Sequence, residues 1–224
     1  MDVMRQVWRD VSFLHWRFDP AVVRPLVPPE LELDLYDGAA WVGLVPFFIN
    51  DLTLPHAPAV PYLSHFPETN VRTYARDRTG GRGVWFFSLD AARLLAVVGA
   101  RIGYALPYFW ARMRVECDGQ SARYRSRRLH APEAGSEIET RIGEPIVSGE
   151  LELFLTLRLR LYAHRLGRIW KADVAHPPWP LQRASVIRCR ESLIRAAGLP
   201  EPTGEPLVHY AKRVDVTVGP LLPL

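Results

Sequence analysis

Hydrophobic and polar residues alternate along much of this chain, which is the pattern of β-strands with one buried face. The alternation is strict from Leu31 to Leu35, and leucine returns at every second position from 151 to 161. The run from 39 to 49 is apolar throughout, which predicts a strand buried on both faces, with Pro46 at an edge or a bulge. Further strands are expected at 11–18, 66–74, 84–89, 112–117, 122–129, 138–142, 169–175 and 209–218. The pattern therefore predicts an α+β protein that is mainly antiparallel β.

Helices are expected to be few and short. Asp19-Pro20 places an N-cap before a proline at the first helical position, which favours a helix start. The helices are expected at 20–24, 91–98 and 191–197, ended by Pro25, Gly99 and Gly198. A short helix over 150–156 is the alternative to the first part of the leucine strand. No repeat or linker interrupts the sequence, so residues 1–224 are predicted to form one domain.

One predicted strand, 66–74, carries a row of polar side chains on a single face. Because side chains alternate between faces, Glu68, Asn70, Arg72 and Tyr74 share this face and stand about 7 Å apart. An anion, an amide, a cation and a phenol can together accept, donate and neutralise charge, which suits a cavity for a small polar ligand. The alternative is an edge strand whose polar face is solvated.

The segment before this strand is rich in proline. Residues 54–67 hold four prolines and are expected to form a loop that acts as a lid or pocket wall. This loop also contains His56 and His65. His65 and Glu68 have the spacing of a metal-binding pair, but no third ligand follows at a recognisable spacing, so neither a metal nor a cofactor is expected.

Composition and charge narrow the classes of partner. The chain is 48% apolar and 23% charged, with a net charge of +4 and a pI of about 9.3. Its basic residues are spread out, and the densest group, within 123–128, fits a solvated strand, so no nucleic acid is expected. Two cysteines make no disulfide framework, and no stretch of about 18 apolar residues predicts a membrane span. A cytoplasmic protein without membrane contact is the expectation.

Six phrases that span nearly the whole chain carry a resemblance to a known family. They are FLHW at 13–16, DGAAWVGLVPF at 37–47, FPETNVRTYA at 66–75, FFSLDA at 86–91, ARIGYALPYFWARM at 100–113 and HPPWPL at 176–181. Together with residues 19–34 they resemble the acetoacetate decarboxylase superfamily, and within it the uncharacterised YqjF-like branch of bacterial proteins. The resemblance implies a closed or cone-like antiparallel β-barrel with a few short helices packed outside and the site in its lumen.

The resemblance also implies roles for particular residues. Glu68 corresponds to one of the family's two active-site glutamates, whereas the other falls near Val42-Gly43, where no carboxylate exists. Arg101 lies in a segment similar to the family's arginine-containing strand. Counting back from Asp19 makes Arg9 the counterpart of an arginine that contacts substrate in the family.

The family's reaction uses a lysine that forms a Schiff base with the substrate, and an adjacent lysine lowers the pKa of that amine. Tyr108 and Phe109 stand at the two corresponding positions, and neither can form an imine. The chain contains two lysines, Lys171 and Lys212, on predicted strands where either could face the lumen. Each lacks a neighbouring lysine. The resemblance therefore predicts that this chain does not decarboxylate acetoacetate through an imine.

The resemblance predicts a protein that retains the family's pocket but lacks its nucleophile. It would bind a carboxylate or an enolisable carbonyl compound, with Arg72 and Arg101 neutralising the anion. If the protein is an enzyme, Glu68 and Tyr108 move protons in lyase, hydratase or isomerase chemistry. The further ligand-binding candidates and pocket walls are Asn70, Tyr74, Tyr104, Arg9 and Trp41. The alternative is a non-catalytic binding or structural protein, in which Glu68, Arg72 and Arg101 form an ion-pair network and Tyr108 only packs.

Assembly is a separate expectation. The apolar content and aromatic residues such as Trp41, Trp85 and Trp110 indicate apolar surface left to be covered. A homo-oligomer is therefore favoured.

Overall fold

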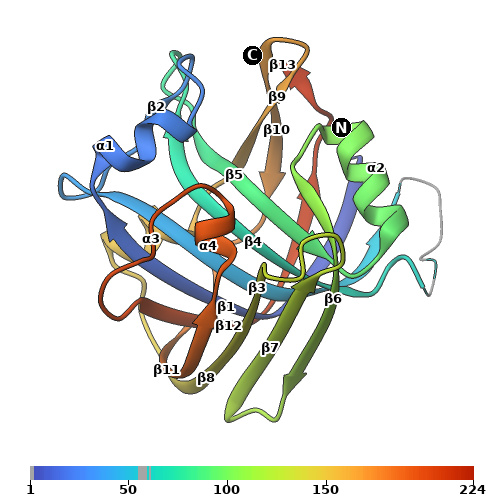
Figure 1. The fold of residues 1–224 in the computed structure, drawn as a ribbon, viewed down its shortest axis with the longest axis vertical. Helices are drawn as coiled ribbons and strands as arrows, with labels where there is room; N and C mark the ends of the chain where they lie inside the picture. The colour runs from blue at the N-terminus through green and yellow to red at the C-terminus, as the bar shows by residue number, and fades with distance from the viewer. Residues whose placement is uncertain (1–2, 55–59, 61) are drawn as a thin grey trace.

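The computed structural model describes residues 3–54, 60 and 62–224 (Figure 1). The strands are β1 (Met4–Phe18), β2 (Glu32–Leu33), β3 (Ala40–Thr53), β4 (Phe66–Arg76), β5 (Arg82–Ala91), β6 (Tyr108–Cys117), β7 (Ser121–Arg128), β8 (Gly135–Pro145), β9 (Arg160–Arg165), β10 (Arg168–Ala175), β11 (Leu181–Glu191), β12 (Leu207–Val218) and β13 (Leu222–Pro223). The helices are α1 (Pro20–Val23), α2 (Leu94–Tyr104), α3 (Glu150–Thr156) and α4 (Leu193–Ala196), with a 3-10 helix η1 (Arg24–Leu26). The predicted mainly antiparallel fold with a few short helices is confirmed.

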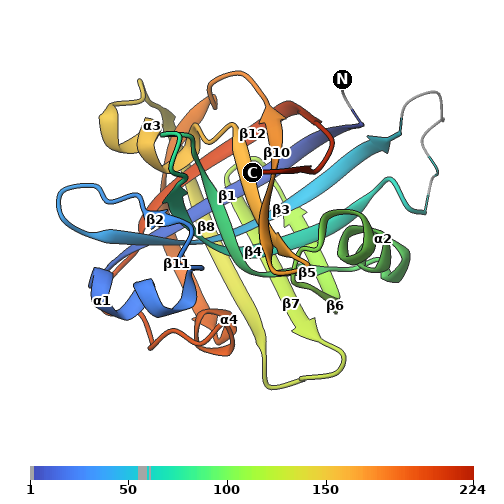
Figure 2. The same cartoon turned by 90° about the horizontal axis from the view of Figure 1, so that it is seen from above.

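The strands form one large sheet that closes on itself. β12, β1, β3, β4, β5, β9 and β10 make a complete ring, because β10 pairs with β12 and β5 pairs with both β4 and β9. β6, β7, β8 and β11 form an arc that also joins β5 to β12. Seen from above, α1 and α4 lie together on one side of the strands, and α2 lies apart from them (Figure 2).

The strip from β12 through β1, β3 and β4 to β5 is part of the ring, and the arc closes a second circuit on the same strip. The strip therefore separates two hydrophobic cores. β4 shows the consequence most clearly, because every residue from Phe66 to Ala75 is buried. Phe66 and Tyr74 contribute to the core inside the ring, whereas Val71 and Ala75 contribute to the core on the other side. The polar face of β4 is therefore turned into the ring and is not solvated.

Helix α2 differs from the prediction. Residues up to Ala91 continue strand β5, and the helix runs on through Gly99 to end at Tyr104, followed by Ala105 with a φ of 52°. Glycine inside a helix costs roughly 1 kcal/mol relative to alanine, which is why Gly99 indicated a helix end. Val97 is buried against the core inside the ring, and this packing offsets the cost. Arg101 consequently lies on a helix and not on a strand.

The leucine repeat also folds differently from the preferred prediction. Residues 150–156 form α3, so the strand is wrong there and the helical alternative is correct. Glu152 Oε2 accepts a hydrogen bond from the backbone N–H of Gly149 at 2.9 Å, which caps the helix start. Leu155 is fully buried in the core, and the strand β9 begins only at Arg160.

Pro46 lies within β3, between β1 and β4, and is paired with Thr69 of β4. On the other side, the register of β1 against β3 breaks between Arg9 and Leu14, and Asp10 there has a φ of 49°. The proline, which has no N–H to donate, thus lies opposite an irregularity of the neighbouring strand. The bulge that Pro46 predicts is confirmed.

The tryptophans expected to leave apolar surface uncovered do not provide it. Trp41 is buried, and Trp85 and Trp110 are half-buried against the cores. The exposed apolar side chains instead gather on α2, where they are Leu94, Leu95, Val98 and Ile102. A homo-oligomer stays a prediction, but these tryptophans no longer support it.

Candidate functional site

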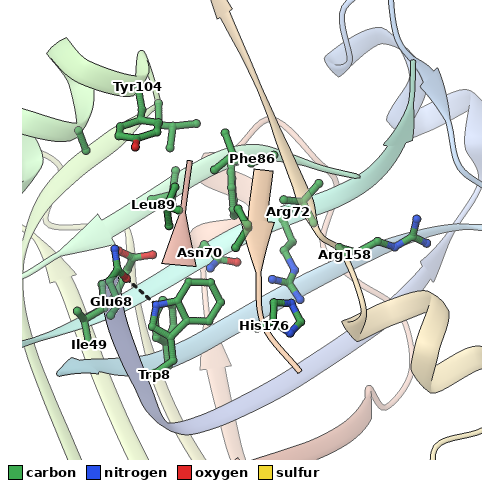
Figure 3. A pocket seen from close by; sticks show the side chains of 18 of the residues that line it. Trp8, Ile49, Glu68, Asn70, Arg72, Phe86, Leu89, Tyr104, Arg158 and His176 are labelled. Atoms are coloured by element: carbon green, nitrogen blue, oxygen red, sulfur yellow. Dashed lines mark hydrogen bonds between the residues drawn. The ribbon is translucent and has the colours of Figure 1, made fainter. Parts of the chain in front are cut away.

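The ring encloses a cavity of about 100 Å³, here called the inner cavity, into which the polar row of β4 points (Figure 3). Glu68, Asn70 and Arg72 line it from β4, and Figure 3 shows Asn70 between the other two. Its remaining walls come from β1, β3, β5, α2, β9, β10, β12 and the segments around Tyr108, Arg158 and His176. The sheet thus brings together residues that are far apart in the sequence.

Glu68 lies at the end of the row nearest Tyr108. Its side chain is buried, and its Oε2 accepts a hydrogen bond from the Tyr108 hydroxyl at 2.8 Å. Burial and, to a smaller extent, the nearby charge of Asp90 raise the pKa of Glu68 from 4.5 to about 8, against the opposing hydrogen bonds of Tyr108 and Asn70. Near neutral pH Glu68 is therefore mostly protonated. The pair can donate a proton to a bound molecule.

Tyr108 responds to the same environment. Burial raises the pKa of its phenol well above 10, and the adjacent Glu68 raises it further. Tyr108 therefore keeps its proton and acts as a hydrogen-bond donor to Glu68. The structure brings these two predicted site residues into direct contact.

Arg72 lies farther along the row and is also buried, at 7% exposure. Its Nη2 donates one long hydrogen bond, of 3.5 Å, to the carbonyl of Leu155, and its Nε has no partner. Aromatic rings of Phe13 and Tyr74 lie 5.6 and 5.9 Å from the guanidinium. Within the described residues, no carboxylate approaches Arg72 to ion-pair distance.

Two histidines lie close to the Arg72 guanidinium and do not compensate its charge. His176 lies beside it in Figure 3, and burial, together with the charge of Arg72, lowers the pKa of this imidazole. His15 is fully buried on the same side, and the same two causes lower its pKa well below 6.5. Both rings are neutral near pH 7, so they add no second positive charge beside Arg72.

His176 has a defined tautomer. Its Nδ1 lies 2.8 Å from the carbonyl oxygen of Pro177, which can only accept a hydrogen bond, so Nδ1 carries the proton. The lone pair is then on Nε2. His176 lines the inner cavity, and hydrogen bonding to the backbone of Pro177 and Arg158 raises the pKa of this imidazole against the larger effect of burial.

A second arginine, Arg158, reaches the inner cavity and is paired. Its Nη1 donates to Asp34 Oδ2 at 2.5 Å and its Nε donates to the carbonyl of Phe154 at 2.6 Å. Burial alone would raise the pKa of the Asp34 carboxyl, but hydrogen bonds and charges from Arg82 and Arg158 lower it. Arg158 therefore contrasts with Arg72, because its charge is already neutralised by the protein.

Three other predicted residues lie elsewhere. Arg101 is exposed on α2, where its Nε donates to the carbonyl of Tyr108 at 2.6 Å. Arg9 is exposed on β1, since Trp8 occupies the face of that strand turned to the cavity. Trp41 is packed in the core and does not line the inner cavity. The predicted ion-pair network of Glu68, Arg72 and Arg101 is consequently not formed.

The two remaining tyrosines of the prediction differ in place. Tyr104 lines the inner cavity from α2, and its hydroxyl donates to the carbonyl of Gly219 at 2.9 Å. Tyr74 is fully buried beyond Arg72, where its hydroxyl donates to the carbonyl of Leu155 at 2.7 Å and lies 2.6 Å from His15 Nε2. Tyr74 therefore supports the surroundings of Arg72 and does not line the cavity.

Neither lysine lies at the inner cavity. Lys212 is exposed on β12, because Ala211 and Val214 take the inward positions of that strand. Lys171 is on β10 and lines a separate hollow near Gly219. His65, which was considered as a metal ligand, donates from Nδ1 to Asn50 Oδ1 at 2.7 Å, and His56 lies outside the described residues.

The comparisons with known proteins agree with this fold. Residues 5–215 match the model of DUF2071, a family of uncharacterized conserved proteins. The chain belongs to the DUF2071 family. It is 41% identical to the uncharacterized protein YqjF of Bacillus subtilis over 222 residues, which cover 98% of this chain and 91% of that protein.

Solved structures place this DUF2071 member in the acetoacetate decarboxylase-like fold. The acetoacetate decarboxylase of Legionella pneumophila is similar with a TM-score of 0.72 at 12% identity, covering 99% of this chain and 87% of that one. The enduracididine biosynthesis enzyme MppR, solved with pyruvate, is similar with a TM-score of 0.71 at 11% identity, covering 100% of this chain and 91% of that one. At these identities the likeness shows the fold alone, and it confirms the resemblance found in the sequence.

No helix in the described part of the chain combines the length and the apolar character that crossing a membrane requires.

Proposed function

We propose that the inner cavity binds a small carboxylate or carbonyl compound and that it does so without a lysine. The observation that carries the proposal is Arg72, a buried cation with no carboxylate partner in the described residues. An uncompensated buried charge costs several kcal/mol, so a site that retains one is poised to take an anion from outside. A ligand carboxylate would supply the missing counter-ion.

The rest of the row supports an oxo acid as the ligand class. The Oδ1 of Asn70 is buried without a partner, and Glu68 lies about 13 Å from Arg72 along the strand, measured between backbones. A carboxylate on Arg72 therefore directs the remaining atoms of the ligand past Asn70 toward the protonated Glu68. The structural neighbour MppR was solved with pyruvate, an oxo acid of this kind.

The proposed chemistry is proton transfer next to a carbonyl group. Glu68, oriented by Tyr108, exchanges a proton with a carbonyl group that lies beside it, several carbon atoms away from the carboxylate held at Arg72. An enol formed in this way is the common intermediate of isomerase, hydratase and lyase reactions. The positive charge of Arg72 favours the anionic ligand and opposes protonation of His176 until the ligand is bound.

Binding and proton exchange can be tested together on 5-oxohexanoate, in which three methylene groups separate the carbonyl group from the carboxylate. We expect the acid to raise the melting temperature, because binding to the folded state alone stabilises it. In D₂O we expect the protein to exchange the protons on the carbon next to the oxo group, which NMR follows as loss of their signal. The methyl ester is the matched control, since it lacks the carboxylate, and it should produce neither effect.

The two readouts separate the possible outcomes. Stabilisation without exchange would support the non-catalytic ligand-binding alternative and remove the enzymatic part of the proposal. The absence of any stabilisation by small oxo acids and hydroxy acids would remove the proposed function altogether.

The absence of an imine is a further prediction. We expect borohydride treatment in the presence of acetoacetate or pyruvate to leave the intact mass of the protein unchanged, because Lys171 and Lys212 lie away from the inner cavity. Mass spectrometry after proteolysis checks the result. A stable adduct mapped to either lysine would contradict a lysine-independent site.

A further inference from the structure

A second cavity, here called the outer cavity, adjoins the inner one beneath α2. Its volume is about 360 Å³, and the residues that it shares with the inner cavity are Met4, Gln6, Ile49, Ala100, Tyr104 and Tyr108. The two cavities therefore lie against the same side chains, and a ligand that occupied both would pass between them.

The polar atoms at the junction of the two cavities are already satisfied by the protein. The hydroxyl groups of Tyr104 and Tyr108 donate to the Gly219 carbonyl and to Glu68. The side chain of Gln6 accepts from the Trp8 indole at 2.6 Å and donates to Met4 Sδ at 3.1 Å. The junction therefore presents rings and aliphatic carbons to a ligand and requires no polar atom from it.

Beyond the junction, the outer cavity is apolar. The residues that line it alone are Leu52, Leu54, Leu63, Phe66, Leu95, Ala96 and Gly99. Water in such a space has few hydrogen-bond partners, so an apolar group replaces it favourably. The volume has room for roughly ten atoms of the size of a methylene group, on the basis of about 30 Å³ for a water molecule.

One face of β4 connects the two cavities in a fixed order. Phe66 lines the outer cavity, and Glu68, Asn70 and Arg72 follow it at successive steps into the inner cavity. Each step is about 7 Å. A molecule lying along this face would therefore meet the apolar wall at Phe66 and then the acid, the amide and the cation that Figure 3 shows in that order.

We infer that the ligand is an amphiphilic oxo acid with an unbranched hydrocarbon tail, held with its carboxylate at Arg72 and its tail in the outer cavity. The inference rests on the proposed function, because it takes the head group from that proposal and adds the tail. Phe66, Leu95 and Ala96, which line the outer cavity, would then select for the length of the tail. The short acids that the inner cavity alone could hold would then be weak ligands.

The test is a homologous series of straight-chain 2-oxo acids, from pyruvate to 2-oxohexadecanoate, which is long enough to reach from Arg72 to Phe66, titrated by calorimetry. Each added methylene should tighten binding by about fourfold, until the outer cavity is filled, because burying one contributes about 0.8 kcal/mol. Octan-2-one, which has the tail without the carboxylate, should bind far more weakly than 2-oxooctanoate.

A pair of tryptophan substitutions localises the tail. Ala96→Trp should fill the outer cavity and remove the gain from chain length, while leaving pyruvate affinity unchanged. Val98→Trp adds the same side chain to the exposed face of the same helix and should leave the whole series unchanged.

The outcomes keep this inference apart from the proposed function. If short acids bind but longer ones bind no more tightly, the tail inference is wrong and the proposed function stands. If no member of the series binds, both are wrong. The tail inference is also wrong if the long acids bind to Ala96→Trp as tightly as to the wild type. It is wrong as well if the affinity for long acids falls as the protein concentration rises, because a second copy of the chain would then cover the outer cavity.

Discussion

Replacing Arg72 with methionine is expected to abolish binding of small carboxylates without destabilising the ligand-free protein. In that state Arg72 is a buried charge with one long hydrogen bond, and methionine is unbranched and apolar. The rings of Phe13 and Tyr74 can pack against it. Exchanging buried ionic groups for apolar ones is often neutral or stabilising by about 1–4 kcal/mol, so we expect an unchanged or higher free energy of unfolding.

Arg128 provides the matched control. It is equally buried, but its Nε donates to the fully buried Asp90 Oδ1 at 2.8 Å. Arg128→Met leaves this carboxyl group without its cation and should cost roughly 3–5 kcal/mol. Urea denaturation of both variants, with and without 5-oxohexanoate, measures the contrast. If Arg72→Met loses as much stability as Arg128→Met, then Arg72 is structural and the binding proposal loses its main support.

The contrast between these arginines is not visible in the sequence. The alternation of β4 does predict that Glu68, Asn70 and Arg72 share a face, because a period of two is a local property of a strand. Whether a given arginine is neutralised depends on distant residues. Arg158 meets Asp34, which lies 124 residues earlier, and only the closure of the ring brings the two together. This is also why sequence reasoning missed Arg158 as a residue of the cavity.

The errors in the helices have a related cause. Gly99 indicated a helix end, but the buried side chain of Val97 and the contact of α2 with the ring keep the helix going. That extension places Tyr104 at the cavity and takes Arg101 to the surface. In the leucine repeat, Leu151 and Leu155 also satisfy the helical spacing of four, and the cap from Glu152 to Gly149 decides in favour of α3.

The role of His176 was partly accessible from sequence. The phrase HPPWPL carried the resemblance to the family, but the position of the imidazole beside Arg72 depends on the path of residues 176–180 across the ring. Trp8 was missed for a similar reason. The irregularity at Asp10 resets the inward face of β1, so that counting along the sequence favoured Arg9 in place of its neighbour.

The second large effect concerns Glu68 and pH. Glu68→Gln is expected to stabilise the protein relative to the wild type by roughly 3–5 kcal/mol above pH 8, and by much less below pH 4.5. Folded Glu68 holds its proton up to about pH 8, whereas the unfolded chain releases it near 4.5. Between these values the folded state binds more protons, so wild-type stability falls as pH rises, and glutamine removes this dependence.

The measurement is the free energy of unfolding in urea at several pH values for both proteins. The difference between them should grow from pH 4.5 to about 8 and then level off. The histidines affect the pH dependence of both proteins equally, so their contribution cancels in the difference between the two free energies of unfolding. Glu205→Gln, at an exposed position, is the control and should show no such trend.

Tyr108→Phe tests whether the hydroxyl acts on Glu68 as the geometry indicates. The hydrogen bond from Tyr108 lowers the pKa of Glu68. Its removal should therefore raise the pH up to which stability keeps falling, which is about 8 when Tyr108 is present. In the double variant with Glu68→Gln this shift should vanish, because no carboxyl group remains to titrate.

The contrary outcome for Glu68→Gln is a difference in the free energy of unfolding, relative to wild type, that does not change with pH. This result would mean that Glu68 is ionised at neutral pH. In that case Glu68 could not be the proton donor of the site.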